Sequence, residues 1–162
     1  MASSAVLTNP SVERVRAALG RAGMPAEIVE LPGAARTAKA AADFLGCKVA
    51  QIANSLVFRA EASDIAVLVM SSGACRVDLA RLARALGEPV AKADAEFVRR
   101  HTGFAIGGVA PGGHGVSKVF VEKALAAHGA LWAAAGHPHT VFRLSYPQLL
   151  GITGGLEAEL AA

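Results

Sequence analysis

One segment of the sequence is unusually rich in glycine and is the first candidate for chemistry. Residues 103–115 contain six glycines and one proline, interrupted by apolar residues. Glycine lets backbone N–H groups approach a ligand because no side chain stands in the way. The segment lacks the Gly-Lys-Ser/Thr ending of a phosphate-binding loop, and Pro111 would remove one N–H donor. We therefore predict a loop that presents backbone donors to a ligand, with a purely structural loop as the alternative.

A pair of histidines is the second candidate. His137 and His139 are separated by one residue, close to a predicted strand. They could bind a metal ion, but the spacing supplies no third ligand and the sequence has no HExxH motif. Cys47 and Cys75 lack CxxC spacing, and Ser71-Ser72-Gly73 lacks the GxSxG pattern of a nucleophilic serine. We therefore predict no metal site and no cofactor.

Length and composition favour a single soluble domain. The chain has 162 residues, and its net charge of +3 comes from dispersed basic residues rather than from a basic stripe. Apolar runs such as Ile65–Met70 are too short to span a membrane, and the N-terminus does not resemble a signal peptide. We expect a cytoplasmic protein with no membrane or DNA partner, present as a monomer or weak homodimer.

The elements that would position these segments mix helices with strands. Residues 1–10 are expected to be a tail and residues 11–162 one domain, with Ser11 capping the first helix. Thr37 is expected to cap the next helix and Gly46 to end it. Further helices are predicted at 78–86, 95–101, 122–128 and 145–150, and strands at 26–31, 51–59, 64–70, 118–121, 131–135 and 140–144. A strand is expected to enter and leave the glycine-rich loop, and residues 154–162 to form a tail or short helix. This order predicts a mixed α/β or α+β fold with one partly antiparallel sheet.

Five motifs occur in one order between residues 36 and 155. They are Thr37-Ala38-x-x-Ala41-Ala42-x-x-Leu45-Gly46, Gln51-Ile52-x-x-Ser55-Leu56-Val57-Phe58, Arg76-Val77-Asp78, Thr102–Pro111 and Trp132–His139. With these motifs the chain resembles the YbaK/EbsC-like family, which includes the ProXp-type deacylases and the editing insertion domain of bacterial prolyl-tRNA synthetases. The resemblance implies a single mixed, largely antiparallel curved sheet packed by helices.

The resemblance also implies an activity, the metal-free hydrolysis of the ester bond in mischarged aminoacyl-tRNA. Gly107 and Pro111 match the family's Gly-x-x-x-Pro motif, which shapes the pocket at the reacting carbonyl. Gly107 and Gly108 would then hold the oxyanion, which is often the largest catalytic contribution. His137 or His139 would orient the substrate or help to move a proton.

Asn54 departs from the family pattern. Many members carry a lysine at this position, and it is thought to hold the terminal phosphate or adenosine of the tRNA. Asparagine donates hydrogen bonds but has no charge, so a charge-assisted contact would be lost. Lys48, Lys39 or Arg59 would have to replace that charge, or this branch of the family handles the 3′ end differently.

The expected substrate is a tRNA of the tRNA-Pro type, or another tRNA, that carries a small noncognate amino acid. Its partners would be the 3′ acceptor end of the aminoacyl-tRNA and, as a candidate, an aminoacyl-tRNA synthetase. The alternative is a non-catalytic module of the same fold that binds a nucleotide, an amino acid or tRNA. The expected pocket walls and substrate contacts are Asn54, Leu56, Phe58, Val69, Ser71, Ile106, Pro111 and His139.

Overall fold

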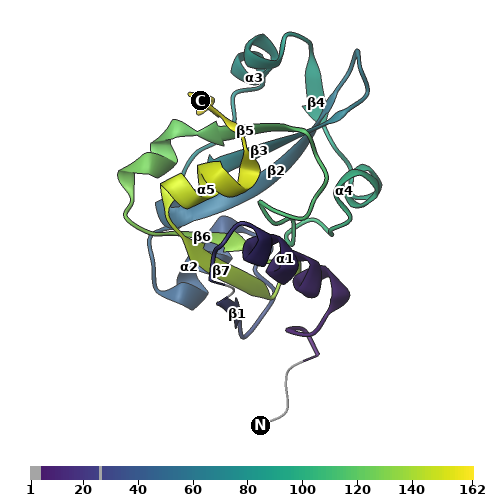
Figure 1. Cartoon of the computed structure of the whole chain (residues 1–162). Helices are drawn as coiled ribbons and strands as arrows, with labels where there is room; N and C mark the ends of the chain where they lie inside the picture. Colours follow the sequence, from purple (N-terminus) through teal and green to yellow (C-terminus); the bar gives the residue numbers. More distant parts are fainter. Residues whose placement is uncertain (1–4, 26) are drawn as a thin grey trace.

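A computed structural model describes residues 5–25 and 27–162. In this part of the chain one mixed sheet of eight strands forms the centre of the molecule, in the order β1-β7-β6-β2-β3-β5-β8, and β4 pairs with β2 (Figure 1). The strands are β1 (Ile28–Glu30), β2 (Ile52–Ala60), β3 (Ala66–Ser72), β4 (Val90–Lys92), β5 (Lys118–Glu122), β6 (Leu131–Ala134), β7 (Thr140–Leu144) and β8 (Leu156–Ala158). The α-helices are α1 (Pro10–Arg21), α2 (Ala38–Leu45), α3 (Leu79–Leu86), α4 (Ala95–Thr102) and α5 (Tyr146–Thr153), and Val49–Gln51 and Lys123–Ala127 form 3₁₀-helices.

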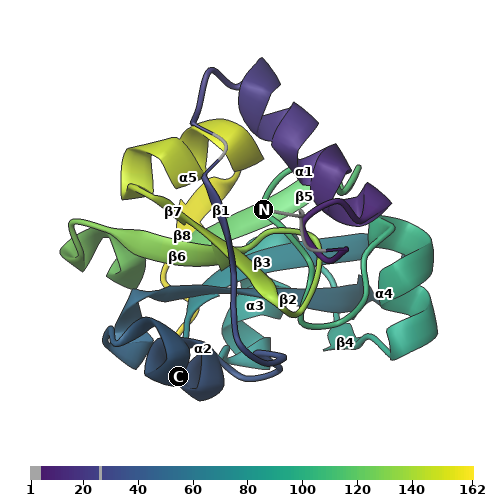
Figure 2. The ribbon, with the colours of Figure 1, turned by 90° about the horizontal axis from the view of Figure 1, so that it is seen from below.

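Alternation along β3 explains why helices cover both faces of the sheet. Leu68 and Met70 pack into a core with residues of α1 and α5, whereas Val67 and Val69 pack into a second core with Leu82 of α3. A strand directs successive side chains to opposite faces, so a strand with apolar side chains on both faces must be covered on both. Accordingly, α1 and α5 lie on one side of the sheet and α2 and α3 on the other (Figure 2).

Most predicted elements are present, and local signals fix several of their ends. Thr37 caps α2 through a hydrogen bond from the Ala40 backbone N–H, and Gly46 ends the helix with φ 67°. The cap predicted for α1 is wrong. Asn9, not Ser11, is the N-cap, and its side chain accepts the N–H of Ser11. Pro10 then occupies the first turn, where a missing N–H costs nothing. Residues 1–4 of the predicted tail and residue 26 of the predicted first strand lie outside the described residues.

Two other expectations were wrong, and one strand was not predicted. No strand enters or leaves the loop at 103–115, because its backbone turns repeatedly, with positive φ at Gly103, Gly107, Gly113 and Gly115. The short strand β4 was missed, and the C-terminal segment contains β8 instead of a tail or helix. Both missed strands are three residues long and form by pairing with residues far away in the sequence, so the local pattern carries little signal.

Candidate functional site

A break in the sheet beside β2 organises the candidate site. On one edge β2 pairs with β3 along Ala53–Arg59, but its other edge is shared by two short strands. There β6 pairs with Ile52 and Ala53, and β4 pairs with Phe58–Ala60. Residues 54–57 therefore have no strand neighbour on that edge, and all four are partly exposed.

The hydrogen-bond alternation shows which backbone groups face the break. Ala60 N–H donates to Ile65, and Gly73 N–H donates to the carbonyl of Ile52, so even-numbered residues of β2 exchange hydrogen bonds with β3. In an antiparallel pair the intervening residues direct their N–H and C=O groups to the opposite edge. The backbone groups of Ser55 and Val57 consequently point into the break, available to a ligand.

A small cavity of about 140 Å³ lies at one end of the break, over α2 and β6. Asn54 borders it and is half-buried. Its amide makes no hydrogen bond within the described structure, and since no buried polar side-chain atom there lacks a partner, this amide is accessible to solvent. The other walls are mostly small, and include Ala35, Ala38, Ala41, Ala53, Ala133, Ala134, Thr37, Thr140 and Trp132.

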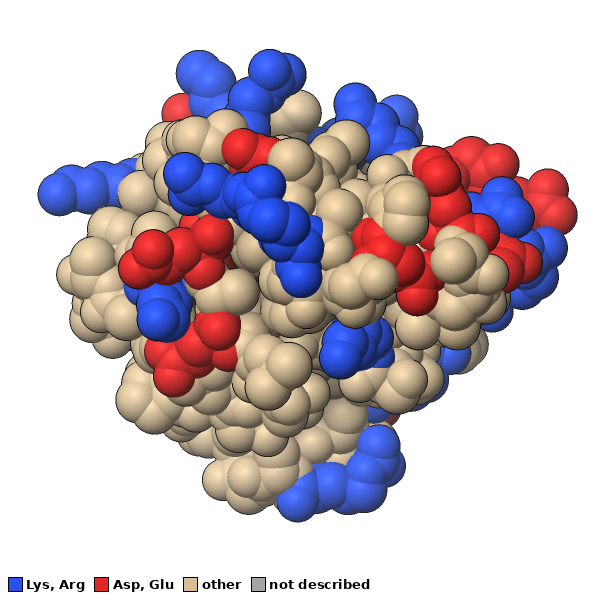
Figure 3. Space-filling view, turned by 90° about the horizontal axis from the view of Figure 1, so that it is seen from above, with Lys and Arg blue, Asp and Glu red and all other residues tan. Residues whose placement is uncertain are grey.

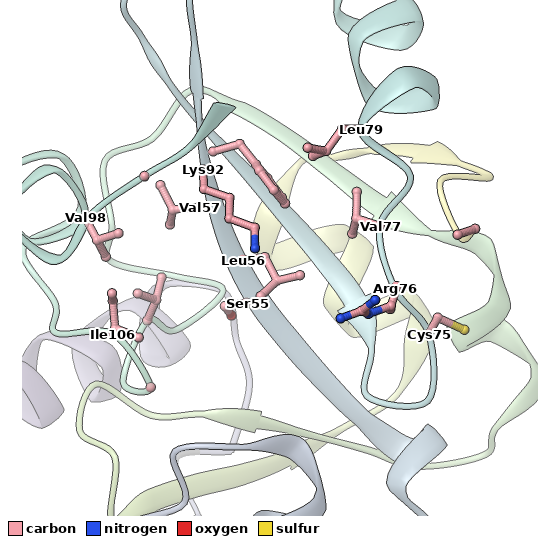
Figure 4. Close-up of a pocket in the computed structure, with 15 residues that line it drawn as sticks. Ser55, Leu56, Val57, Cys75, Arg76, Val77, Leu79, Lys92, Val98 and Ile106 are labelled. Carbon is pink, nitrogen blue, oxygen red and sulfur yellow. The ribbon is translucent and has the colours of Figure 1, made fainter. Parts of the chain in front are cut away.

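A larger cavity of about 600 Å³ lies at the other end, between β2, β4 and the segment that leads into α3 (Figure 4). Its walls are mainly apolar, and include Leu56, Phe58, Val77, Leu79, Val98 and Ile106. Two cations, Arg76 and Lys92, stand on its rim. The two cavities share Ser55, Leu56, Ile106, Gly107 and Val109, so they are compartments of one depression.

The glycine-rich segment forms a tight turn at the boundary between the two cavities. Gly108 N–H donates to the Ala105 carbonyl (2.9 Å), and Gly107 has φ +89° at the third position of this turn. A type II turn requires a positive φ there, which favours glycine. Gly107 lines both cavities, and its own N–H has no hydrogen-bond acceptor in the described part of the chain. The N–H group of Gly107 is therefore a hydrogen-bond donor positioned at the candidate site.

Gly108 has a different role in the geometry. Its N–H is occupied by the turn, and a Cβ at this position would lie 2.9 Å from both Cα and N of His137. The glycine therefore allows the turn to pack directly against the backbone of the histidine loop. The two segments singled out from the sequence are neighbours in space.

The histidine rings, however, line a third cavity. This arginine–histidine cavity of about 490 Å³ is bordered by Arg36, Arg99, His137 and His139, and it shares only Arg36 and Pro138 with the small cavity. His137 Nδ1 accepts the N–H of His139 (3.1 Å), so the neutral ring carries its proton on Nε2. Burial lowers the pKa of His137 below its ordinary value of 6.5, the nearby His139 lowers it further, and Glu30 opposes the shift. In this state His137 can donate through Nε2 but has no free lone pair with which to act as a base.

Several other residues predicted for the site are placed differently by the fold. Leu56, Phe58 and Ile106 do line the large cavity. Ser71 and Val69 are buried in β3 and line neither cavity of the break. Pro111 is also buried away from both cavities, and its carbonyl meets Nε2 of His114 at 3.1 Å.

The cations suggested as replacements for a lysine at position 54 are also elsewhere. Lys39 pairs with Asp43 and Arg59 with Asp64, and neither they nor Lys48 line the two cavities. The cations that do so are Arg36, Arg76 and Lys92. Only Arg76 had a signal in the sequence, as part of a family motif, whereas Lys92 is brought to the site by the pairing of β4 with β2.

The molecular surface shows no single basic stripe on the face seen in Figure 3, where Lys and Arg alternate with Asp and Glu. No helix in the described residues has the length and apolar character needed to cross a membrane. Nor do those residues bring three or more His, Cys, Asp or Glu side chains together as a metal site would.

Comparison with known proteins supports the predicted family. Residues 32–152 match the model of the aminoacyl-tRNA editing domain. A solved structure of a protein proposed to be a trans-editing enzyme for prolyl-tRNA synthetase is 42% identical, with a TM-score of 0.87 over 95% of this chain and 98% of that one. A structure from work on grafting epitope backbones onto scaffold proteins is 39% identical, with a TM-score of 0.87 over 95% and 99% of the two chains.

A relative from Bacillus subtilis (strain 168), the uncharacterized protein YwhH, is 25% identical over 124 residues, which are 76% of this chain and 78% of that protein. The family model covers most of the chain and includes α2, the whole of β2, the glycine-rich turn and the histidine loop. By these matches, the chain belongs to the aminoacyl-tRNA editing domain family.

Proposed function

We propose that this protein hydrolyses the ester bond of mischarged aminoacyl-tRNA at the break in the sheet beside β2. The observation that carries the assignment is the meeting of three features at one place. The unpaired edge of β2, the free N–H of Gly107 and the boundary between a small and a large cavity coincide there. An ester linking an amino acid to a ribose has its reacting carbonyl between two groups of unequal size, which suits such a boundary.

The small cavity is the proposed place for the amino-acid side chain. Its volume of about 140 Å³ gives room for about four or five water-sized groups. Ala38 and Ala41 of α2 and Ala133 and Ala134 of β6 form much of its wall. A small noncognate amino acid such as alanine fits this space, and the amide of Asn54 can donate to its acyl group or to the neighbouring ribose.

Stabilisation of the oxyanion is assigned to the backbone. Gly107 N–H and the edge N–H groups of Ser55 and Val57 are donors fixed by a turn and a strand, so they need no reorganisation when negative charge develops on the carbonyl oxygen. Gly108 supports this arrangement by fitting the turn against His137. His137 and His139 then act from the neighbouring cavity, where His137 can orient the turn or the tRNA end.

The proton acceptor for the attacking water is assigned to the substrate. Among the described residues that line the two cavities there is no Asp, Glu or His. A hydroxyl of the terminal ribose or the amino group of the amino acid lies next to the ester in any bound pose, and either group can accept the proton of the attacking water. The protein would act where charged tRNA is made, in the cytoplasm, with a synthetase as a candidate partner.

A panel of mischarged tRNAs tests the proposal. Release of free amino acid should be fast for small residues such as alanine and slow for phenylalanine. Ala38→Leu should decrease the rate by about tenfold or more by filling the small cavity, since even small overlaps in packed sites cost 1–3 kcal/mol. Ala40→Leu, on the same helix but outside the cavity, is the matched control. Tight binding of tRNA with no release from any member of the panel would instead favour a non-catalytic binding module.

A further inference from the structure

The large apolar cavity is not used by the chemistry proposed so far. We propose that it seats the 3′-terminal adenosine of the tRNA, and that Lys92 and Arg76 on its rim bind the phosphate that precedes this nucleoside. This inference rests on the proposed function, because it places the nucleotide next to the ester.

The size and character of the cavity suit a nucleoside. About 600 Å³ holds about twenty water-sized groups, comparable to a purine base with its ribose. Leu56 and Phe58 of β2 and Val77 and Leu79 near α3 give it an apolar lining. Such walls accept the faces of a base without selecting hydrogen bonds, as stacking platforms for single-stranded nucleic acid do.

Two cationic side chains, those of Lys92 and Arg76, also border this apolar cavity. The side chains of Lys92 and Arg76 come from opposite sides of the cavity and both point into it (Figure 4). Both residues are exposed, and neither forms an ion pair within the described residues. Two unpaired cations facing each other repel, so an anion bound between them would be favoured.

The neighbouring carboxylates are already engaged elsewhere. Asp94, close to Lys92 in the chain, caps α4 by accepting the N–H of Phe97, and Glu96 faces Arg100. Asp78, close to Arg76, caps α3. None of these three carboxylates forms an ion pair with Lys92 or Arg76.

The position of the cavity fits a ribose ester. It meets the small amino-acid cavity at Leu56, Ile106 and Gly107, and Ile106 is 55% exposed there. With the side chain of the amino acid in the small cavity, the ester lies beneath Gly107 and the nucleoside extends into the large one. The positive charge that Asn54 does not supply at β2 is then supplied by Lys92 and Arg76 from the other side of the break.

Binding of a CCA trinucleotide, measured by fluorescence anisotropy across a salt series, tests the site directly. Lys92→Ala and Arg76→Ala should each weaken binding by about threefold to tenfold, as expected for an exposed ionic contact. Removing both cations together should also reduce the slope of log affinity against log salt by about 0.7, the value for one single-strand phosphate contact, and each single variant should give part of this decrease. Lys92→Arg keeps the positive charge and should retain both the affinity and the salt dependence of the unmodified protein. Lys123→Ala and Arg84→Ala remove the same charges outside these cavities and should behave as the unmodified protein.

Deacylation kinetics complete the test and separate this inference from the proposed function. Lys92→Ala should raise KM for mischarged tRNA and leave kcat nearly unchanged. If the trinucleotide binds as described but no mischarged tRNA is hydrolysed, the proposed function fails and the nucleotide site stands.

If hydrolysis proceeds and both variants match the Lys123→Ala and Arg84→Ala controls, the nucleotide site fails and the function stands. A larger loss of binding from Arg99→Ala, in the arginine–histidine cavity, would overturn the choice of cavity. AMP carries the same adenosine and preceding phosphate, so excess AMP should displace the trinucleotide. Failure of AMP to compete would overturn the choice of occupant.

Discussion

Asn54 stands where the resemblance of the sequence to the family led us to expect a lysine, and the structure places it on the wall of the small cavity with a free amide. If that amide donates one neutral hydrogen bond to the substrate, Asn54→Ala should decrease the deacylation rate by about tenfold, since such a bond contributes about 0.5–1.5 kcal/mol. Asn54→Lys should strengthen tRNA engagement, most visibly at low salt. Kinetics of both variants across a salt series, corrected for the folded fraction, provide the measurement. Unchanged rates in both would remove Asn54 from the site.

Gly107 combines a backbone requirement with a position at the site. Its φ of +89° means that Gly107→Ala is strained, and we expect a loss of stability of about 1 kcal/mol or more. Turnover per folded molecule should fall as well, because a displaced turn carries the N–H donor away from the ester. Gly115→Ala is a suitable control, since Gly115 has φ +72°, has open space around it and lines neither cavity of the break. Equal turnover in the two variants, with equal loss of melting temperature, would show that Gly107 serves only the backbone.

At the scale of elements, the C-terminal segment closes one side of the large cavity. Glu122 at the end of β5 is buried, and its carboxylate accepts the N–H groups of Leu160 and Ala161. Asp78 N–H donates to the Leu160 carbonyl, and Ala162 N–H donates to the carbonyl of Arg76. The buried carboxylate thus fixes the segment that holds the Arg76 loop in place.

Glu122→Ala should therefore destabilise the fold by about 2–3 kcal/mol, because one buried and one partly buried N–H group lose a charged acceptor. The midpoint of chemical denaturation measures this. Glu159→Ala, an exposed neighbour, should change stability by no more than about 0.5 kcal/mol. If the two variants prove equally stable, Glu122 does not act as this anchor.

At the scale of the whole molecule, two histidines link stability to pH. Burial lowers the pKa of His114 below 6.5, as it does for His137, and the Nδ1 atom of each ring accepts a backbone N–H. The unfolded chain therefore binds protons more readily than the folded one, and stability must fall as pH decreases through 6.5. Denaturation at pH 7.5 and 5.5, values on either side of the histidine pKa of about 6.5, should show the loss. His114→Gln should reduce this loss of stability at low pH, whereas His128→Gln should not.

A prediction about metal also belongs to this scale. The sequence offers no ligand set with zinc-like spacing, so deacylation should be unchanged by a chelator such as EDTA. Elemental analysis of the purified protein provides an independent measurement. One tightly bound transition metal per chain, with activity lost on its removal, would contradict the prediction.

Local signals in the sequence determined much of this protein. The cap at Thr37, the stop at Gly46 and the short turn that joins the runs of β2 and β3 act between residues close in the chain, so they can be recognised without a structure. The same holds for the order of motifs that identified the family. The glycine-rich and histidine segments were both singled out from the sequence, and the structure packs them against each other, although their roles in catalysis stay predictions.

Tertiary structure alone decided how the site is built. The break beside β2 exists because β6 and β4, from distant parts of the chain, pair with its two ends and leave the middle free. That same pairing brings Lys92 to the cavity, while the turn at Gly107 faces the break and the rings of His137 and His139 face another cavity. Short strands carry little sequence signal of their own, and their partners are chosen by long-range packing. For this reason the sequence could name the loops but not the cavity that each side chain faces.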